Sequence, residues 1–457
     1  MSFLAVKGAH RPLFASLYET ILGFKQLKHI RHGNKLDIMN AAMKTSAKGL
    51  LALATSLVLV GSAFAQTTQK KEPLTEEIKT DVLKGMEKII STAAYVPGVD
   101  FSKWSEFVSK HEADIKKASN ETEFVNAVNG ALEDFGFSHI YLFPPSFGEQ
   151  RATGKRAGIG IRVQIEEGGL RITDIFPNSP ASKAGLQRGD LVFENDGKPV
   201  KSTADLAGDK GQTSTIKYKR GTEEKSITVT RDDYVTVIPE SIEWKGETAV
   251  ITIPTFDQGY STENVEKIMG EAMKAKLIVL DFRSNGGGRV TNLMHLMGYF
   301  LKRETEPLGT FIGRAAMNAY KKENPDAALD LAKIADFTKG KVRPWENEVQ
   351  FGGKVAVLIS GSTGSASEMA AAALKEYKGA TLIGSPSAGA VLASMFAPID
   401  SGHGYILQFP MTDYVTIKGR RLEANPLKPD VAAEIPGYGQ EDKALTAALS
   451  LLKSGSK

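Results

Sequence analysis

The sequence predicts an α/β protein whose core has largely parallel strands, with a helical region before the core and a β-rich domain inserted between the two. Apolar strands and amphipathic helices alternate between residues 247 and 385, an order that gives parallel strands. Residues 156–235 instead hold short alternating strands with glycine-rich turns. From residue 74 to about 135, apolar residues recur every three or four positions, which is typical of helices.

Composition limits the classes of protein to which the chain can belong. Its 457 residues exceed the usual size of one domain, and 42% apolar with 24% charged residues is ordinary for a soluble globular protein. Cysteine is absent, which excludes disulfides, thiolate nucleophiles and cysteine-bound metals. Residues 1–66 contribute +6 to the formal net charge of +4, which leaves −2 for the remainder. A nucleic-acid partner is therefore not expected.

The N-terminal segment has the three parts of an export signal in the right order. Residues 43–48 are basic, residues 49–61 form an uncharged apolar run, and Ala63-Phe64-Ala65 matches a small-x-small cleavage pattern. The apolar run is shorter than the roughly 20 residues of a membrane span. We therefore expect a protein that is exported to the periplasm or secreted, with no stable membrane span after cleavage. A buried helix is the alternative.

The rest of the chain divides into segments of different pattern. After the extension and signal at 1–65 we expect a helical region at 66–150, a β-rich domain at 156–235, an α/β core at 236–435 and a C-terminal helix or tail at 436–457. The core strands are expected at 247–254, 277–283, 355–360 and 380–385, with helices at 261–274, 290–301 and 365–377 between them. The charged insertion at 303–353 is long enough to form a lid or a small subdomain.

The β-rich segment resembles a PDZ domain in the circularly permuted form of bacterial proteases. It begins Gly158-Ile159-Gly160-Ile161, and Pro177–Ala181 and Gly189–Val192 continue the pattern. The resemblance implies that the first four residues form a loop whose N–H groups bind the C-terminal carboxylate of a peptide. The helix beside that groove, near residues 203–208, looks about one turn short. A PDZ fold that packs or gates without binding peptide is the alternative.

Three further motifs identify a family. They are Asp281-Phe282-Arg283-Ser284-Asn285-Gly286-Gly287-Gly288, Gly364-Ser365-Ala366-Ser367-Glu368 and Gly384-Ser385-Pro386-Ser387-Ala388-Gly389-Ala390. Each follows an apolar strand. In this order and spacing they resemble the C-terminal processing and tricorn-core serine peptidases. With the helical region and the PDZ-like domain, the resemblance covers roughly residues 75–435.

Ser365 is the candidate nucleophile because it lies where a strand turns into a helix. Free N–H groups and the helix dipole favour negative charge there. We expect the Ala366 N–H to hold a developing oxyanion, with a second donor from the glycine run: Gly287, or else Gly286 or Gly288. The alternative is structural, because Ser365 and Glu368 also have the spacing of a capping box.

A serine nucleophile needs a base. The bacterial processing branch of the family uses a lysine 25 positions after the serine, but this chain has Ala390 there, and Ser394 where that branch has a glutamine. The tricorn-like branch instead uses a histidine preceded by serine, just before the PDZ domain. Ser138-His139 match that pair. The other histidines of the mature chain, His111, His295 and His403, read as solvated or core residues.

The tricorn-like branch also uses a glutamate late in the chain, before a Pro-Asp turn. Glu423 fits, and the resemblance implies that it orients His139 with Ser138 as intermediary. The glycine that usually follows is replaced by Asn425-Pro426, and a surface glutamate in a turn is the alternative.

The predicted function is that of an exported serine endopeptidase that cleaves protein or peptide substrates through an acyl-enzyme. No metal or organic cofactor is required, and no pattern such as H-E-x-x-H is present. The alternative is an inactive binding or adaptor protein on the same fold, which would hold an apolar ligand or a PDZ-type peptide. The sequence does not predict the oligomeric state.

Overall fold

The computed structural model describes residues 73–437 and 439–452. The export signal predicted for residues 1–65 lies outside them. Within the described residues, no helix has both the length and the apolar character needed to cross a membrane.

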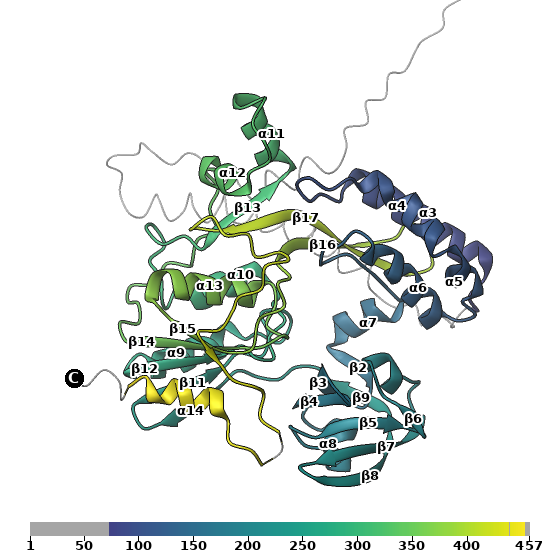
Figure 1. The fold of residues 1–457 in the computed structure, drawn as a ribbon, viewed down its shortest axis with the longest axis horizontal. Helices are drawn as coiled ribbons and strands as arrows, with labels where there is room; N and C mark the ends of the chain where they lie inside the picture. The colour runs from purple at the N-terminus through teal and green to yellow at the C-terminus, as the bar shows by residue number, and fades with distance from the viewer. Residues whose placement is uncertain (1–72, 438, 453–457) are drawn as a thin grey trace, which may run out of the picture. The chain divides into compact units, whose positions relative to one another are not determined.

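The main sheet confirms the predicted α/β core. Its order is β10-β11-β12-β14-β15-β18, and every pair from β11 to β18 is parallel (Figure 1). The strands are β10 (Ser241–Lys245), β11 (Thr248–Thr252), β12 (Leu277–Asp281), β14 (Lys354–Ile359), β15 (Thr381–Gly384) and β18 (Val431–Ala432). Strands such as LIVLD and KVAVLI are apolar on both faces because helices cover both sides of a parallel sheet.

Helices of the core pack on opposite faces of this sheet. On one face, α9 (Thr262–Ala272), α10 (Val290–Met297) and α13 (Ala366–Lys378) form the largest apolar cluster with the strands. On the other face, α14 (Lys443–Ser450) packs beside β14 and β15, and its Ala444 and Ala448 share an apolar cluster with Leu358 and Ile383. The carboxyl ends of β12 and β14 therefore meet the start of α13, which is where ligands bind in such sheets.

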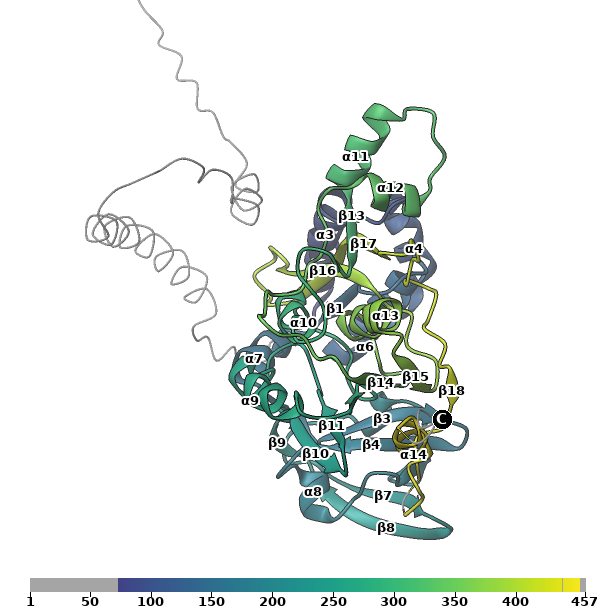
Figure 2. The same ribbon diagram turned by 90° about the vertical axis from the view of Figure 1, so that its left-hand side faces the viewer.

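A second sheet lies on the other side of the helices that cover the main sheet (Figure 1). The long β17 (Ile406–Thr416) pairs with β16 (Leu392–Pro398) along one edge, and with β1 (Tyr141–Phe143) and β13 (Gly309–Gly313) along the other. The predicted insertion supplies β13 and then α11 (Arg314–Glu323) and α12 (Leu331–Phe337), which pack beside β13 in both ribbon views (Figure 2).

The N-terminal helices close the far side of the second sheet. They are α3 (Glu76–Thr92), η1 (Phe101–Lys103), α4 (Trp104–Lys110), α5 (Glu112–Lys117) and α6 (Glu121–Glu133). The side chains of Thr75 and Asn120 cap α3 and α6, and the helices share an apolar cluster with residues of β1 and β17. This contact holds β1, and with it the residues just before β1, against the core.

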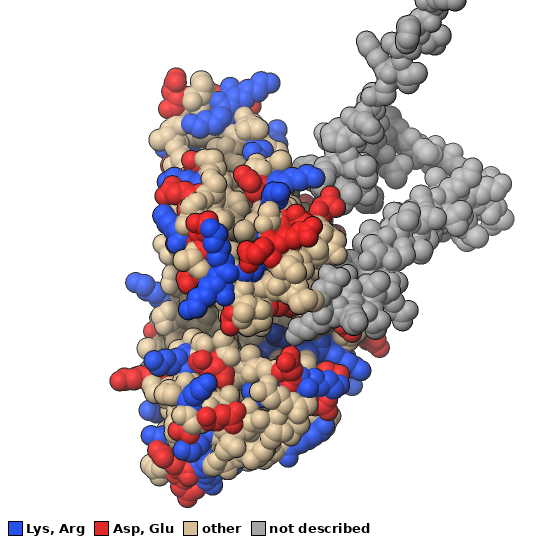
Figure 3. Space-filling view, turned by 90° about the vertical axis from the view of Figure 1, so that its right-hand side faces the viewer, with Lys and Arg blue, Asp and Glu red and all other residues tan. Residues whose placement is uncertain are grey.

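The PDZ domain follows α7 (Ser146–Thr153). Its strands are β2 (Lys155–Gly158), β3 (Ile161–Glu166), β4 (Gly169–Ile175), β5 (Leu191–Asn195), β6 (Lys198–Pro199), β7 (Thr213–Arg220), β8 (Glu223–Thr230) and β9 (Asp232–Val235), with helix α8 (Pro180–Ala184) and one turn of 3-10 helix, η2 (Thr203–Leu206). The larger sheet has the order β3-β4-β5-β7-β8, so β3 lies at its edge. The space-filling view in Figure 3 shows acidic and basic side chains interspersed over one face of the described residues.

Candidate active site

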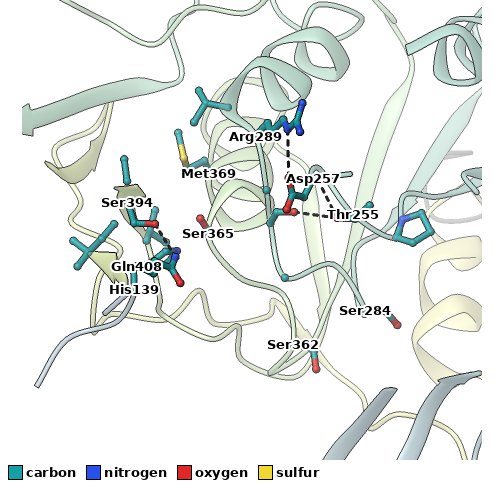
Figure 4. Close-up of a pocket in the computed structure, with 18 of the residues that line it drawn as sticks. His139, Thr255, Asp257, Ser284, Arg289, Ser362, Ser365, Met369, Ser394 and Gln408 are labelled. Carbon is teal, nitrogen blue, oxygen red and sulfur yellow. Dashed lines mark hydrogen bonds and ion pairs between the residues drawn. The ribbon is translucent and has the colours of Figure 1, made fainter. Parts of the chain in front are cut away.

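A cleft of about 780 Å³ brings the predicted site residues together. Its lining comes from the glycine run after β12, the start of α13, β16 and β17, His139, α7, and the β3 edge of the PDZ domain. Figure 4 shows Ser365 between His139 on one side and Asp257 with Arg289 on the other.

Ser365 has an unusual backbone conformation, with φ 53° and ψ −119°. Such a positive φ in a residue other than glycine costs about 1–3 kcal/mol and is found at functional sites. Two hydrogen bonds hold it, because the Ser365 N–H donates to Ala390 O at 2.9 Å and to Glu368 Oε2 at 3.2 Å. The predicted capping box is present. Ser365 is therefore both the cap of α13 and a serine turned into the cleft.

The glycine run passes directly against the serine. Gly287 has φ +99°, and a Cβ on it would lie 2.7 Å from the Ser365 Cβ and 2.8 Å from Gly364 O, so only glycine fits there. The Gly287 N–H, however, donates to Asn285 Oδ1 at 2.9 Å. Sequence reasoning missed Asn285, although an asparagine two residues before a glycine is a common turn signal.

The N–H groups near Ser365 differ in availability. Among the described residues, no hydrogen bond is made by the N–H of Ala366 or by those of Gly286 and Gly288, the alternatives to Gly287. The Ala366 N–H lies at the start of α13, where such groups have no partner within the helix. The Gly287 N–H already donates to the Asn285 side chain, so the identity of the second oxyanion donor stays a prediction.

His139 is connected to Glu423 through Ser138. Ser138 Oγ lies 2.6 Å from His139 Nδ1 and 2.9 Å from Glu423 Oε2, and the Ser138 N–H donates to Glu423 Oε1 at 2.7 Å. A hydroxyl has one proton and a carboxylate only accepts, so Ser138 donates to Glu423 and accepts from Nδ1–H. That assignment leaves His139 Nε2 unprotonated, as a general base requires.

Glu423 is buried, with 2% of its surface exposed, which excludes the alternative of a surface glutamate. Its Oε2 also accepts from the Val391 N–H at 2.7 Å. The departure at Asn425-Pro426 does not displace the carboxylate, because the Ala424 N–H donates to Gly389 O and Asn425 Nδ2 donates to Glu423 O. One backbone hydrogen bond and one from the Asn425 side chain thus fix the loop in place of the usual glycine.

Burial shifts the pKa of two titratable groups of the site, His139 and Glu368. Burial lowers the pKa of His139, and the charge of Glu423 opposes this in part, so the imidazole is neutral at pH 7. Burial raises the pKa of Glu368. Four donors form hydrogen bonds to its side chain, and these donors are the hydroxyl of Ser387 and the N–H groups of Gly389, Ala390 and Ser365. All four groups donate to the carboxyl oxygens of Glu368, which opposes the effect of burial on its pKa in part.

His139 and Ser365 line the same cleft, but no hydrogen bond joins these two described residues. Ala390, at the position of the family's lysine, contributes its backbone to the site. Ser394 Oγ accepts from Gln408 Nε2 at 2.7 Å, a pairing that the sequence did not reveal. Among the described lining residues there is no lysine, and no group of His, Asp and Glu in the described chain is arranged to hold a metal.

The predicted carboxylate-binding loop of the PDZ domain is closely packed. Ile159 is buried and its carbonyl accepts from the Ala181 N–H, while Gly160 O accepts from the Phe176 N–H. Gly158 pairs within β2 and β9, and Ile161 opens β3 and lines the cleft. The helix expected beside the groove is the single turn η2. The edge of β3 and Thr203 therefore face the cleft that holds Ser365.

Comparisons with known proteins agree with the fold described above. Residues 247–433 match the model of peptidase family S41, and residues 157–230 match the model of the PDZ domain. A "Probable CtpA-like serine protease" of Staphylococcus epidermidis is 26% identical over 335 residues, which cover 71% of this chain and 63% of that protein. A protein of the same name from Staphylococcus aureus is 26% identical over 343 residues, which cover 71% of this chain and 62% of the relative.

Two solved structures share the fold. Mature CPAF superposes with a TM-score of 0.55 at 14% identity, covering 84% of this chain and 99% of that one. The photosystem II D1 C-terminal processing protease does so with a TM-score of 0.50 at 19% identity, covering 79% and 93%. The fold is thus that of an α/β core similar to the S41 peptidases, with a domain similar to PDZ domains before it. Residues 247–433 of the α/β core are similar to peptidase family S41, and the chain spans less than two thirds of the length of the two relatives named above.

Proposed function

We propose that this chain is an exported serine endopeptidase in which Ser365 is the nucleophile and His139 the general base. The observation that supports it most is the relay of hydrogen bonds from Glu423 through Ser138 to His139, which faces the same cleft as Ser365. A buried carboxylate that orients a neutral imidazole is what a serine without a nearby lysine requires.

The mechanism follows from these positions. His139 Nε2 takes the proton of the Ser365 hydroxyl as Oγ attacks a peptide carbonyl. The Ala366 N–H and one N–H of the glycine run stabilise the oxyanion, and Glu423 stabilises the imidazolium through Ser138. His139 then gives the proton to the leaving amine, and water releases the acyl group from Ser365 by the same route.

The second candidate function is a non-catalytic binding protein on the same fold. It is favoured by the missing hydrogen bond between His139 and Ser365 and by Ala390 at the position of the family's lysine. The proposed peptidase requires the two side chains to approach when substrate binds, which is common because catalytic hydrogen bonds tighten in the substrate complex.

Paired substitutions test the catalytic assignment. Ser365→Ala and His139→Ala are each expected to abolish cleavage of an unfolded protein, while thermal unfolding stays close to that of the wild type. Ser362→Ala, in another serine that lines the cleft, and His403→Ala, in a histidine outside it, are the matched controls. A fluorophosphonate is expected to label Ser365 alone. Full turnover by His139→Ala would exclude the base, and the absence of turnover and labelling in the wild type would favour the binding protein.

Export is proposed from the pattern of residues 43–65. The chain expressed in a bacterium with an intact secretion system is expected to accumulate outside the cytoplasm with Gln66 as its first residue. N-terminal sequencing of the mature protein measures this directly. An uncleaved N-terminus in the cytoplasmic fraction would refute the proposal, without bearing on the peptidase site.

A further inference from the structure

The charged side chains of the cleft are unbalanced. Among its described lining residues are three arginines, Arg151, Arg162 and Arg289, and one carboxylate, Asp257. Since His139 is neutral at pH 7, the lining has an excess of positive charge inside a concave surface. Such a surface concentrates the field and favours a negatively charged ligand.

Arg162 is engaged in holding the fold. Its Nη1 donates to Ser284 O at 3.0 Å and to Pro254 O at 3.3 Å, and its guanidinium lies 5.2 Å from the centre of the Phe176 ring. These contacts join β3 of the PDZ domain to the loop before the glycine run. Arg162 is therefore a structural cation, and the excess charge available to a ligand lies on the other two arginines.

Arg151 and Arg289 share the single carboxylate of Asp257. Arg151 Nη2 lies 3.2 Å from Asp257 Oδ1, and Arg289 Nε lies 3.4 Å from the same oxygen. Each guanidinium has five N–H donors, so most of their donors have no acceptor among the described residues. The Arg151 guanidinium also lies 4.4 Å from the centre of the ring of Phe396, another residue that lines the cleft.

Arg289 directly follows the glycine run that packs against the nucleophile. Gly287 packs against Ser365, and Gly288 packs against Asp257, since a Cβ added to Gly288 would lie 2.1 Å from Asp257 N. In Figure 4, Arg289 and Asp257 lie on the opposite side of Ser365 from His139. The Arg289 side chain is 57% exposed, so its fork of donors is open to a bound chain.

We propose that Arg289, supported by Arg151, binds a carboxylate of the substrate within one or two residues of the scissile bond. This inference rests on the proposed peptidase function and names a feature of its substrates. A guanidinium fork matches a carboxylate in a bidentate contact, and Asp257 holds both arginines in place without neutralising them. The carboxylate comes from an acidic side chain or from the C-terminus of the peptide.

Matched peptides test the proposal. The substrates are quenched fluorescent peptides of otherwise neutral residues. In each pair of peptides, one position near the cleaved bond carries Glu in one peptide and Gln in the other, and the pairs differ in which position this is. Every peptide is made in two forms, with a free C-terminal carboxylate and with a C-terminal amide. At one position the wild type is expected to cleave the Glu peptide with about tenfold higher kcat/KM than the Gln peptide. Arg289→Gln is expected to remove that preference, so that the variant cleaves the Glu and Gln peptides with equal kcat/KM. A preference for the acid over the amide, lost in Arg289→Gln, would instead assign the C-terminal carboxylate.

The control is Arg156→Gln, which removes an exposed arginine of the PDZ domain outside the cleft and should keep the full preference. Equal cleavage of all peptide pairs by an active wild type would overturn the carboxylate site and leave the peptidase intact. Binding of the labelled peptides to the Ser365→Ala protein, measured by fluorescence anisotropy, decides the matter even if no peptide is cleaved. In that case equal affinity for the Glu and Gln peptides would overturn the site.

Discussion

Replacing Ser138 by alanine tests the relay on which the proposed function depends. The change removes the oxygen that accepts the His139 Nδ1–H and donates to Glu423, but Glu423 keeps the N–H groups of residue 138 and Val391. The ring then loses the contact that stabilises its charged form in the transition state. A hydrogen bond that involves a charged group contributes about 1.5–3 kcal/mol.

At ~1.4 kcal/mol per factor of ten, this loss corresponds to a roughly 10- to 100-fold decrease in kcat. KM should change little, because Ser138 does not line the cleft. Steady-state kinetics on a fluorogenic peptide measure both values, and Ser138→Thr, which keeps a hydroxyl, should restore most of kcat. A kcat within twofold of the wild type, or an effect confined to KM, would refute the relay.

Three other perturbations have defined outcomes. Gly287→Ala should decrease kcat about 100-fold and lower the melting temperature, since its Cβ would collide with Ser365 at a positive φ; an active, stable variant would contradict the contact. Burial lowers the pKa of His139, so kcat/KM should fall only as the pH drops below about 6.5, the ordinary pKa of histidine. A pH–rate profile measures this, and a midpoint above pH 7 would be inconsistent with the buried base. Glu368→Gln should lower the free energy of unfolding by about 1–3 kcal/mol, because the NH2 group of the new side chain must face N–H donors where a carboxylate oxygen accepted from them. Urea denaturation measures this, and an unchanged unfolding midpoint would argue against these hydrogen bonds.

The core could be predicted because its strands have a simple signature. Segments such as residues 277–281 and 355–359 are apolar on both faces and alternate with amphipathic helices, and the parallel sheet confirms that reading. The second sheet was not predicted. β17 pairs with β1, which lies more than 260 residues earlier, and local periodicity contains no information about such partners.

The site could be predicted only in part from chemistry. A serine between a strand and a helix, with a glycine run nearby, is visible in the sequence. The link from Ser138 to Glu423 spans 285 residues and was inferred only from a family resemblance. The bond between Asn285 and Gly287 and the arginine pair around Asp257 were missed, because each depends on how side chains turn once the loops are folded.

Position 390 shows how the two halves of the site are joined. The Gly389 and Ala390 N–H groups donate to Glu368, the next N–H along, that of Val391, donates to Glu423, and Ala390 O accepts from Ser365. One short stretch of main chain therefore connects the carboxylate behind the nucleophile to the carboxylate behind the base. Changes to Glu368 and Glu423 should consequently be non-additive in a double-mutant cycle, because each shifts the segment that the other fixes.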